Sequence, residues 1–168
     1  DEPTTDFLGK TCEQWEHTVD KFNQLNIRTV KLRTGIVLAK EGGALPKMMM
    51  PFNYGLGSAI GSGKQYVPWI SLTDLCNMYL FAVENNQLQG SFNAAIEDET
   101  TNLILSEAIA ESLNKKIWLS NVPALVLKMI FGEMANLLLY GSRVSNKKIK
   151  SFGFKFEYEN LPQWFINK

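Results

Sequence analysis

The sequence contains one histidine and only two cysteines, and this scarcity excludes several kinds of site. His17, Cys12 and Cys76 give no candidate set of ligands for a zinc ion. A Ser–His–Asp arrangement would depend on His17, but this residue lies on the helix face away from Trp15 and Val19 and is interpreted as solvent-facing. Cys12 and Cys76 lie in apolar helical patterns, which predicts buried free thiols in a reducing compartment and no disulfide framework.

The sequence also lacks an excess of charge and a long hydrophobic run. Lys and Arg together number 17, as do Asp and Glu, so no overall charge favours nucleic acid or an anionic membrane. The local basic run at residues 147–150 is interpreted as a solvated helix face. The longest apolar stretch, residues 122–131, is too short to cross a bilayer and is interrupted by Pro123 and Lys128. We expect a soluble, cytoplasmic protein with neither a nucleic-acid nor a membrane partner.

A phosphate-binding glycine loop is missing as well. Residues 57–64 (GSAIGSGK) approach a P-loop, but Ser58 replaces its first glycine and Gln65 replaces the Ser or Thr that holds the metal. Residues 55–57 lack the third glycine of a dinucleotide fingerprint and precede no helix. Because the chain also begins at Asp1 without an initiator Met, we expect it to be the C-terminal piece of a larger protein.

The remaining pattern alternates helices and strands, which indicates the α/β class. An amphipathic helix over residues 6–25 is followed by a buried strand over residues 27–38. Residues 40–68 form a glycine-punctuated excursion, and excursions of this length are usually functional loops. A helix is expected from about residue 71 to 85, and its buried face would consist of Leu72, Leu75, Cys76, Tyr79 and Val83. Short strands are expected at residues 92–94, 117–119 and 154–156.

Several helix boundaries carry local signals. Ser71 and Asp74 resemble a capping box, and this role of Asp74 is favoured over that of a catalytic carboxylate at a helix start. Thr100 or Thr101 caps a later helix, and Pro123 stands close to the first turn of another, which Gly132 interrupts.

Five residues are candidates for ligand contacts. Arg33 stands at the carboxyl end of the predicted strand, where open α/β sheets bind ligands, and is either a ligand contact or an ion-pair anchor. The excursion contributes Lys47, Gln65, Tyr66 and Trp69, whose polar and aromatic groups suit a small-molecule pocket. Ordinary loop packing explains these four residues equally well.

Several runs resemble the epimerase-like family of atypical short-chain dehydrogenase/reductases. They are residues 31–38 (KLRTGIVL), 42–52 (GGALPKMMMPF), 55–70 (GLGSAIGSGKQYVPWI) and 73–74 (TD). Residues 131–144 (FGEMANLLLYGSRV) and 153–158 (GFKFEY) are similar to that family's C-terminal extension, a module of unassigned role. The resemblance extends over residues 6–165.

This resemblance implies an α/β protein that is the C-terminal portion of a Rossmann-type NAD(P)-binding fold plus a small, mainly helical C-terminal module. Residues 1–98 would belong to the Rossmann-type domain, with a substrate-side loop at 40–70, and residues 99–168 would form the substrate side and the extension. The parent would bind NADP or NAD, with Arg33, Thr34, Gly35, Ile36 and Val37 beside the nicotinamide end. Lys47, Gln65, Tyr66 and Trp69 would lie on the substrate side, and no metal is expected.

One departure from the family concerns catalysis. Typical members carry Tyr-x-x-x-Lys on the helix that corresponds to residues 6–25. A register set by Glu16 places Leu8 and Cys12 at these positions, and a register that uses Lys10 places Asp6 at the tyrosine. Hydride transfer to a carbonyl needs an acid to protonate the developing oxyanion, which Leu cannot be. No catalytic residue is therefore assigned.

Two functions remain open. The parent is either an NAD(P)-dependent, sugar-nucleotide-epimerase-like oxidoreductase or isomerase acting on a small molecule, or a catalytically degenerate module that senses cofactor or regulates, as some relatives' cell-division-inhibitor names suggest. A third reading is a structural remnant. The fragment alone is expected to be inactive and to bind no cofactor, because the pyrophosphate-binding turn is absent. An open sheet edge predicts a homodimer or pairing with a missing N-terminal half.

Overall fold

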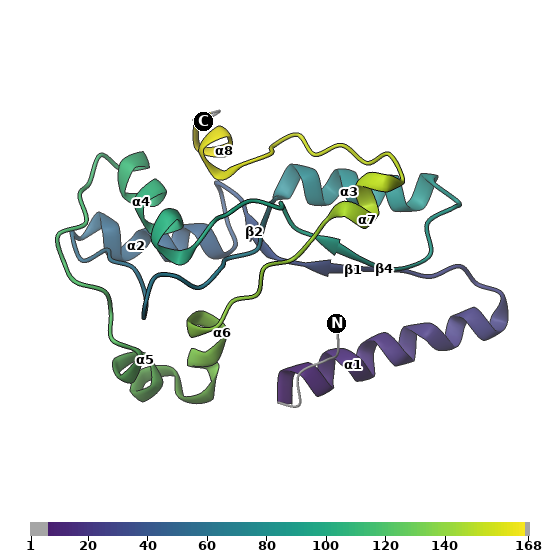
Figure 1. The fold of residues 1–168 in the computed structure, drawn as a ribbon, viewed down its shortest axis with the longest axis horizontal. Coiled ribbons are helices and arrows are strands. Elements are labelled where there is room, and N and C mark those ends of the chain that lie inside the picture. The colour runs from purple at the N-terminus through teal and green to yellow at the C-terminus, as the bar shows by residue number, and fades with distance from the viewer. Residues whose placement is uncertain (1–6, 167–168) are drawn as a thin grey trace.

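The computed structural model describes residues 7–166, in which helices surround two short pairs of parallel strands (Figure 1). The N-terminal half contains α1 (Phe7–Asp20), the 3-10 helix η1 (Lys21–Leu25), β1 (Val30–Thr34), β2 (Ile36–Leu38), α2 (Ala44–Asn53), β3 (Trp69–Ser71) and α3 (Leu72–Glu84). The C-terminal half contains β4 (Gly90–Ala94), α4 (Asn102–Ser112), α5 (Ala124–Phe131), η2 (Gly132–Ala135), α6 (Asn136–Leu139), α7 (Lys147–Ser151) and α8 (Leu161–Ile166).

The single strand predicted over residues 27–38 is two strands that change partner at Gly35. β1 pairs in parallel with β4, and β2 pairs in parallel with β3. At the junction, the Gly35 amide donates to the Ala94 carbonyl at 3.1 Å, and the Ile36 amide donates to the Pro68 carbonyl at 2.8 Å. A Cβ at position 35 would lie 2.6 Å from the Pro68 oxygen, so only glycine permits this close approach.

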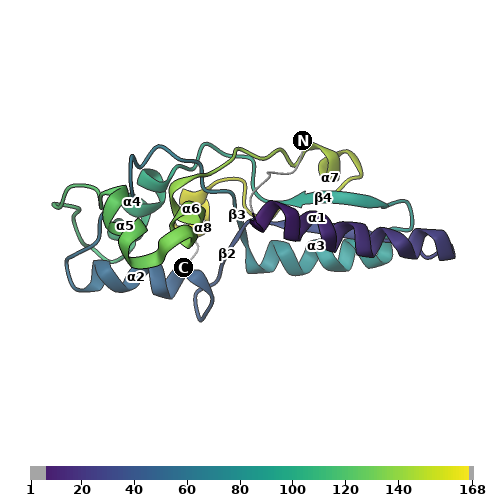
Figure 2. The same cartoon turned by 90° about the horizontal axis from the view of Figure 1, so that it is seen from below.

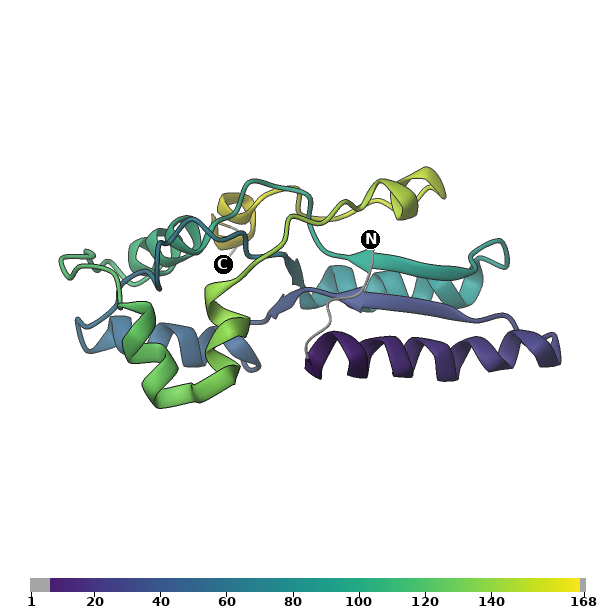
Figure 3. The same ribbon diagram turned by 60° about the horizontal axis from the view of Figure 1, so that its bottom comes forward.

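The β1–β4 pair has one apolar and one polar face, as the alternation of side chains along strands requires. Its apolar face packs under α3 and the segment around α7, in a cluster that includes Ile70, Met78, Leu88, Phe92, Ile149 and Phe154. The polar face carries Lys31, Arg33 and Ser91, which contact α1. The strands therefore lie between α3 and α1 (Figures 1 and 3).

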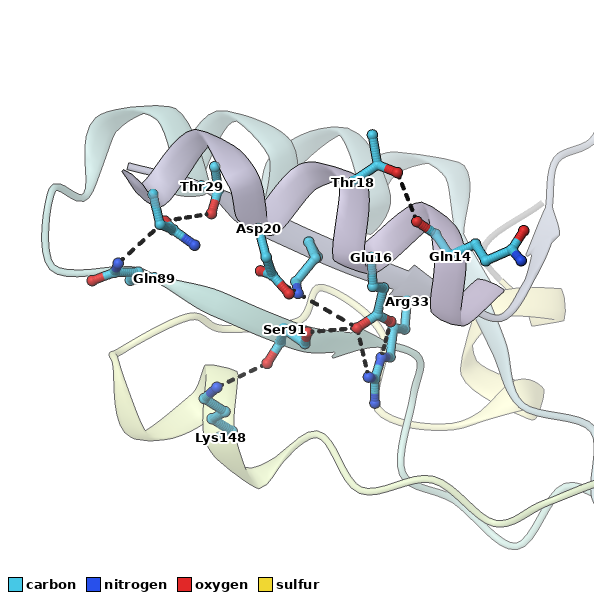
Figure 4. Close-up of polar contacts among 11 residues, drawn as sticks. Gln14, Glu16, Thr18, Asp20, Thr29, Arg33, Gln89, Ser91 and Lys148 are labelled. Atoms are coloured by element: carbon cyan, nitrogen blue, oxygen red, sulfur yellow. Dashed lines mark hydrogen bonds and ion pairs between the residues drawn. The ribbon is translucent and has the colours of Figure 1, made fainter. Parts of the chain in front are cut away.

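Ion pairs and hydrogen bonds attach α1 to this polar face (Figure 4). Glu16 accepts from Arg33 Nε at 2.5 Å and from Arg33 Nη2 at 2.8 Å, and Ser91 Oγ donates to it at 3.2 Å. Lys31 Nζ lies 2.7 Å from Asp20 and 3.6 Å from Glu16. The hydrogen bond from Arg33 lowers the pKa of Glu16 from 4.5 to about 2, and the same bond raises the pKa of Arg33. Of the two roles considered for Arg33, the structure confirms the ion-pair anchor.

A second apolar cluster lies at the other end of the molecule, where Figure 2 shows α2, α4, α5, α6 and α8 gathered away from α1, α3 and β4. Its buried members include Leu38, Leu45, Phe52, Leu105, Ile109, Leu161 and Trp164. Trp69 is fully buried in this cluster, where its ring meets Trp164 edge-on and its Nε1 donates to Asp98 at 3.1 Å. Both clusters draw residues from either side of residue 98, and the domain division there stays a prediction.

The predicted buried faces of α1 and α3 are wrong. Cys12 and Cys76 are exposed, and so are Leu72, Tyr79 and Val83. The reason is that α3 packs on the strands mainly through Met78 and Ala82, and of the predicted face Leu75 alone packs beside them. α1 turns Glu16 and Asp20 towards the strands. The large apolar side chains that α1 and η1 expose are Phe7, Trp15, Phe22 and Leu25.

Two further predictions need correction. The excursion at residues 40–68 contains a ten-residue helix, α2, with Pro51 inside it. Residues 117–119 and 154–156 form no strand. The rings of Phe154 and Phe156 meet edge-on, with their centroids 4.9 Å apart, so the alternation of apolar residues there reflects side-chain packing and not pairing with another strand.

The structure confirms several of the predicted helix boundaries. Ser71 caps α3, and Thr101 caps α4 by accepting from the Ile104 amide. Pro123 immediately precedes α5, and Gly132 immediately follows it. His17 is solvent-exposed, as predicted. Within residues 7–166, none of the helices combines the length and the apolar character that a membrane crossing requires.

The burial of Trp69 predicts a large effect of its removal. Trp69→Ala is expected to lower the free energy of unfolding by about 3–5 kcal/mol, because it deletes a fully buried ring and leaves a cavity. Trp118, which is 71% exposed, is the matched control, and Trp118→Ala should change the value by less than about 0.5 kcal/mol. Urea unfolding of this chain measures both, and equal losses would contradict the assignment of Trp69 to the core.

The lowered pKa of Glu16 predicts an acid-dependent attachment of α1. A carboxyl group whose pKa falls on folding contributes stability above its unfolded pKa of 4.5 and loses it as the pH falls towards about 2. Glu16→Gln should therefore cost about 1 kcal/mol at neutral pH, and the difference from wild type should vanish through that window. Urea unfolding across pH tests this, with Glu13→Gln as control because the ion-pair partner of Glu13 within residues 7–166 is the exposed His17, at 4.0 Å. A Glu16→Gln deficit that stays constant with pH would refute it.

Candidate functional site

A cavity of about 360 Å³ lies at the carboxyl end of β1, within the usual range of small-molecule sites, about 300–1,000 Å³. Five residues predicted from the sequence line it: Thr34, Gly35, Ile36, Gln65 and Tyr66. The first three come from the junction of β1 and β2, and the other two from the loop between α2 and β3. The structure therefore brings part of the predicted cofactor side and part of the predicted substrate side together.

The other four predicted site residues lie elsewhere. Arg33 is held by Glu16 on the polar face of the strands, and Val37 packs against the cluster under α3. Lys47 is exposed on α2, where the neighbouring Met48 lines the cavity instead. Trp69 is enclosed in the second apolar cluster. None of these four is among the residues that line the cavity.

Asp74, the other candidate carboxylate, is fully buried and has a structural role. Its amide donates to Ser71 Oγ at 2.9 Å, and Ser71 Oγ donates to its Oδ2 at 2.8 Å. Its Oδ1 accepts from the Glu157 amide at 2.6 Å, so both carboxylate oxygens are used within the chain. The predicted cap at Ser71 is confirmed, whereas the Asp74 carboxylate binds the Ser71 hydroxyl and fastens the segment before α8.

The opposite wall of the cavity comes from a distant part of the sequence, the segment 138–142. Leu138, Tyr140, Gly141 and Ser142 line the cavity from this side. Sequence reasoning missed them as site residues, because they lie some seventy positions beyond the loop that they face, and no local spacing connects the two. The isolated glycine at position 141 was the one local signal, since such a residue often marks a close approach of two backbones.

Gln65 and Gly141 hold the segment 138–142 against the loop. Gln65 Nε2 donates to the Ile60 carbonyl at 3.0 Å and to the Leu138 carbonyl at 3.1 Å. A Cβ at position 141 would lie 1.8 Å from the Tyr66 carbonyl oxygen, so the two backbones touch there. The loop is also joined to Val122 by two backbone hydrogen bonds of 2.9 Å.

The loop also covers the N-terminus of α4. The Asn102 amide donates to the Gln65 carbonyl and the Leu103 amide to the Gly63 carbonyl, each at 2.9 Å. The Ile104 amide donates to the Thr101 hydroxyl at 3.3 Å. An exposed helix N-terminus can bind an anion through such amides, but here the chain itself occupies them.

Among the described residues that line the cavity there is no Asp, Glu, Lys, Arg or His, and the ionisable side chains are the phenols of Tyr66 and Tyr140. Arg143, next to Ser142, lines an adjacent recess and pairs with Glu99 at 2.5 Å, and Tyr66 donates to the same carboxylate at 3.2 Å. In residues 7–166 no three His, Cys, Asp or Glu side chains come together as metal ligands. The site can therefore enclose a small molecule, but its own side chains offer no charged acid or base.

Comparison with known proteins gives three kinds of match. Residues 122–165 match a family described as "Domain of unknown function (DUF1731)". An epimerase family protein of Staphylococcus aureus is 36% identical over 158 residues, which make up 93% of this chain and 52% of that protein.

Solved structures agree with these matches. The human epimerase family protein SDR39U1, crystallised with NADPH, is 32% identical with a TM-score of 0.74 over 79% of this chain and 45% of its own. The UDP-glucose 4-epimerase of Thermus thermophilus in complex with NAD is 17% identical, with a TM-score of 0.69 over 89% and 48% of the two chains, and so shows the fold alone.

The predicted fold class is thus confirmed: parallel strands and helices of a Rossmann-type fold are followed by a mainly helical C-terminal part. The chain spans about half the length of the curated relatives that it matches. Its sequence and fold are similar to the C-terminal part of epimerase family proteins.

Proposed function

We propose that the protein to which this chain belongs is an NAD(P)-dependent oxidoreductase or isomerase of the epimerase type that acts on a small molecule. The observation that carries this proposal is the cavity at the carboxyl end of β1, because open α/β sheets bind ligands at that end of their strands. The human relative with NADPH, at 32% identity, supports a nicotinamide cofactor, either NADP or NAD.

The described residues fit one end of such a cofactor. Thr34, Gly35 and Ile36 line the cavity and would lie beside the nicotinamide, and Gln65 and Tyr66 would face the substrate. The pyrophosphate needs other residues, since the amides at the start of α4 are occupied by the loop. When bound, the nicotinamide supplies or accepts the hydride, and the wall of the cavity excludes water and orients the substrate.

A second candidate function is a module that senses the cofactor or regulates another protein without turnover. This function is favoured by the missing Tyr-x-x-x-Lys motif on α1. When α1 is aligned with the family by Glu16, Cys12 takes the position of the lysine. Glu16 itself is bound by Arg33 and Ser91. The described cavity lining contains no lysine or carboxylic acid, so the candidate acids for an oxyanion there are the phenols of Tyr66 and Tyr140.

The full-length protein is expected to bind NADPH or NADH, which fluorescence titration measures. The 168-residue chain by itself should bind neither, because it offers no site for the pyrophosphate. Gln65→Ala should leave the affinity for the cofactor unchanged and lower turnover, with Lys64→Ala as its neighbour control. If the full-length protein binds neither nucleotide, the proposal fails; if it binds one but turns over no carbonyl or alcohol from a broad panel, the regulatory function is favoured.

We also propose that the outward-facing apolar side of α1 and the free edge of β1 pair with the part of the sheet that this chain does not contain. Within the described residues β1 has β4 as its single neighbour. Phe7 and Trp15 are 78% and 69% exposed on α1, an unusual exposure for ring side chains. Relatives of about twice the length support a covalent partner, and a second copy of the chain would take its place in the isolated chain.

The isolated chain should therefore associate, which light scattering would detect as a mass above 19.0 kDa. Trp15→Glu places a charge in the apolar side of α1 and should shift the mass towards the monomer. His17→Glu, on another face of the same helix, should leave the association unchanged. A monodisperse monomer of the unchanged chain would rule out this pairing surface.

A further inference from the structure

The cavity differs from a nucleotide-sugar site in its charge. All its described lining residues are uncharged, and most of its exposed lining is apolar, with Ile36, Met48 and Leu138 among the contributors. A nucleoside diphosphate brings several negative charges, which proteins bind with arginine, lysine or free backbone amides. A buried anion without such partners is strongly disfavoured.

Most polar groups that could bind phosphate are already in use. Both protons of the Gln65 amide are donated to backbone carbonyls. Asn102, whose amide oxygen accepts from the Ile60 amide at 2.7 Å, adds an uncharged side-chain amide to the lining. The amides at the start of α4 are bound by the loop. Arg143 is neutralised by Glu99 and lines the adjacent recess instead of the cavity.

Two hydroxyl groups remain, and both come from the C-terminal extension. The hydroxyls of Tyr140 and Ser142 make no hydrogen bond to another residue that the structure describes, and both residues line the cavity. A ligand with a single carbonyl or hydroxyl group on an apolar body matches this lining, since one polar contact fixes its orientation and the rest is buried against carbon. The match to a domain of unknown function includes these residues.

We propose that the cavity takes an uncharged, mainly apolar carbonyl or alcohol compound, and that the C-terminal extension selects it by supplying Leu138, Tyr140 and Ser142 as one wall. This inference rests on the proposed function, because it names the substrate class of the same site. It gives the extension a role in recognition. The proposed substrate class also differs from the nucleotide sugar in the name of the Thermus protein, a UDP-glucose 4-epimerase.

The test is calorimetric titration of the full-length protein with two uncharged probes, menthone and octanal, and with UDP-glucose. The titrations are run with and without NADPH, whose own binding is measured first. At least one uncharged probe should bind, and UDP-glucose should not. Leu138→Trp fills the cavity and should weaken the probe at least about tenfold. Leu125→Trp, at a position 69% exposed on α5 of the same extension, should leave binding unchanged.

The outcomes separate the two proposals. Absence of NADPH binding by the unchanged protein argues against the proposed function. Normal NADPH binding together with UDP-glucose binding that Leu138→Trp abolishes overturns the substrate class alone. The substrate class is also overturned if neither uncharged probe binds up to its solubility limit, or if Leu138→Trp does not change the affinity for a probe that binds. Ser142→Phe provides a second block of the cavity if Leu138→Trp does not fold, which circular dichroism would show.

Discussion

The change of strand partner at Gly35 is the constraint on which the rest of the structure depends. Before Gly35 the chain pairs with β4, and after it the chain pairs with β3. The Gly35 amide donates to the Ala94 carbonyl, and the Ile36 amide donates to the Pro68 carbonyl. This close contact sets the positions of both strand pairs and of the apolar clusters built on them. It also brings Thr34 and Ile36 to the rim of the cavity. A side chain at position 35 would push the Pro68 backbone away and disturb all of these together.

The two helices beside β1 and β4 are attached by different forces. α3 buries Met78 and Ala82 against the apolar face, so its attachment depends on area removed from water. α1 is held through Glu16 and Asp20, whose partners on the strands are charged or polar. Because such contacts are weaker when exposed, α1 is the less firmly bound helix within this chain. Its aromatic side chains point away from the strands, where a further layer of structure would cover them.

Local signals in the sequence predicted local features well. Ser71 with Asp74, Thr101 and Pro123 mark helix starts because capping depends on residues within one turn. The buried faces of α1 and α3 were not predictable in this way. Periodicity shows which side of a helix is apolar, but here the residues that the structure describes leave most of that side exposed. The site was half predicted for a related reason: Gln65 and Tyr66 lie in the recognisable loop, whereas Tyr140 reaches it only through tertiary packing.

The contacts that hold the segment 138–142 involve its backbone. Gln65 binds the carbonyl oxygen of Leu138, and position 141 needs only the absence of a side chain against Tyr66. Neither contact depends on which side chains stand at positions 138, 140 and 142. Relatives could therefore exchange these three residues, and with them the shape and polarity of the cavity, while the segment keeps its course. A fixed frame with replaceable lining residues is a simple route by which one scaffold diverges towards new ligands.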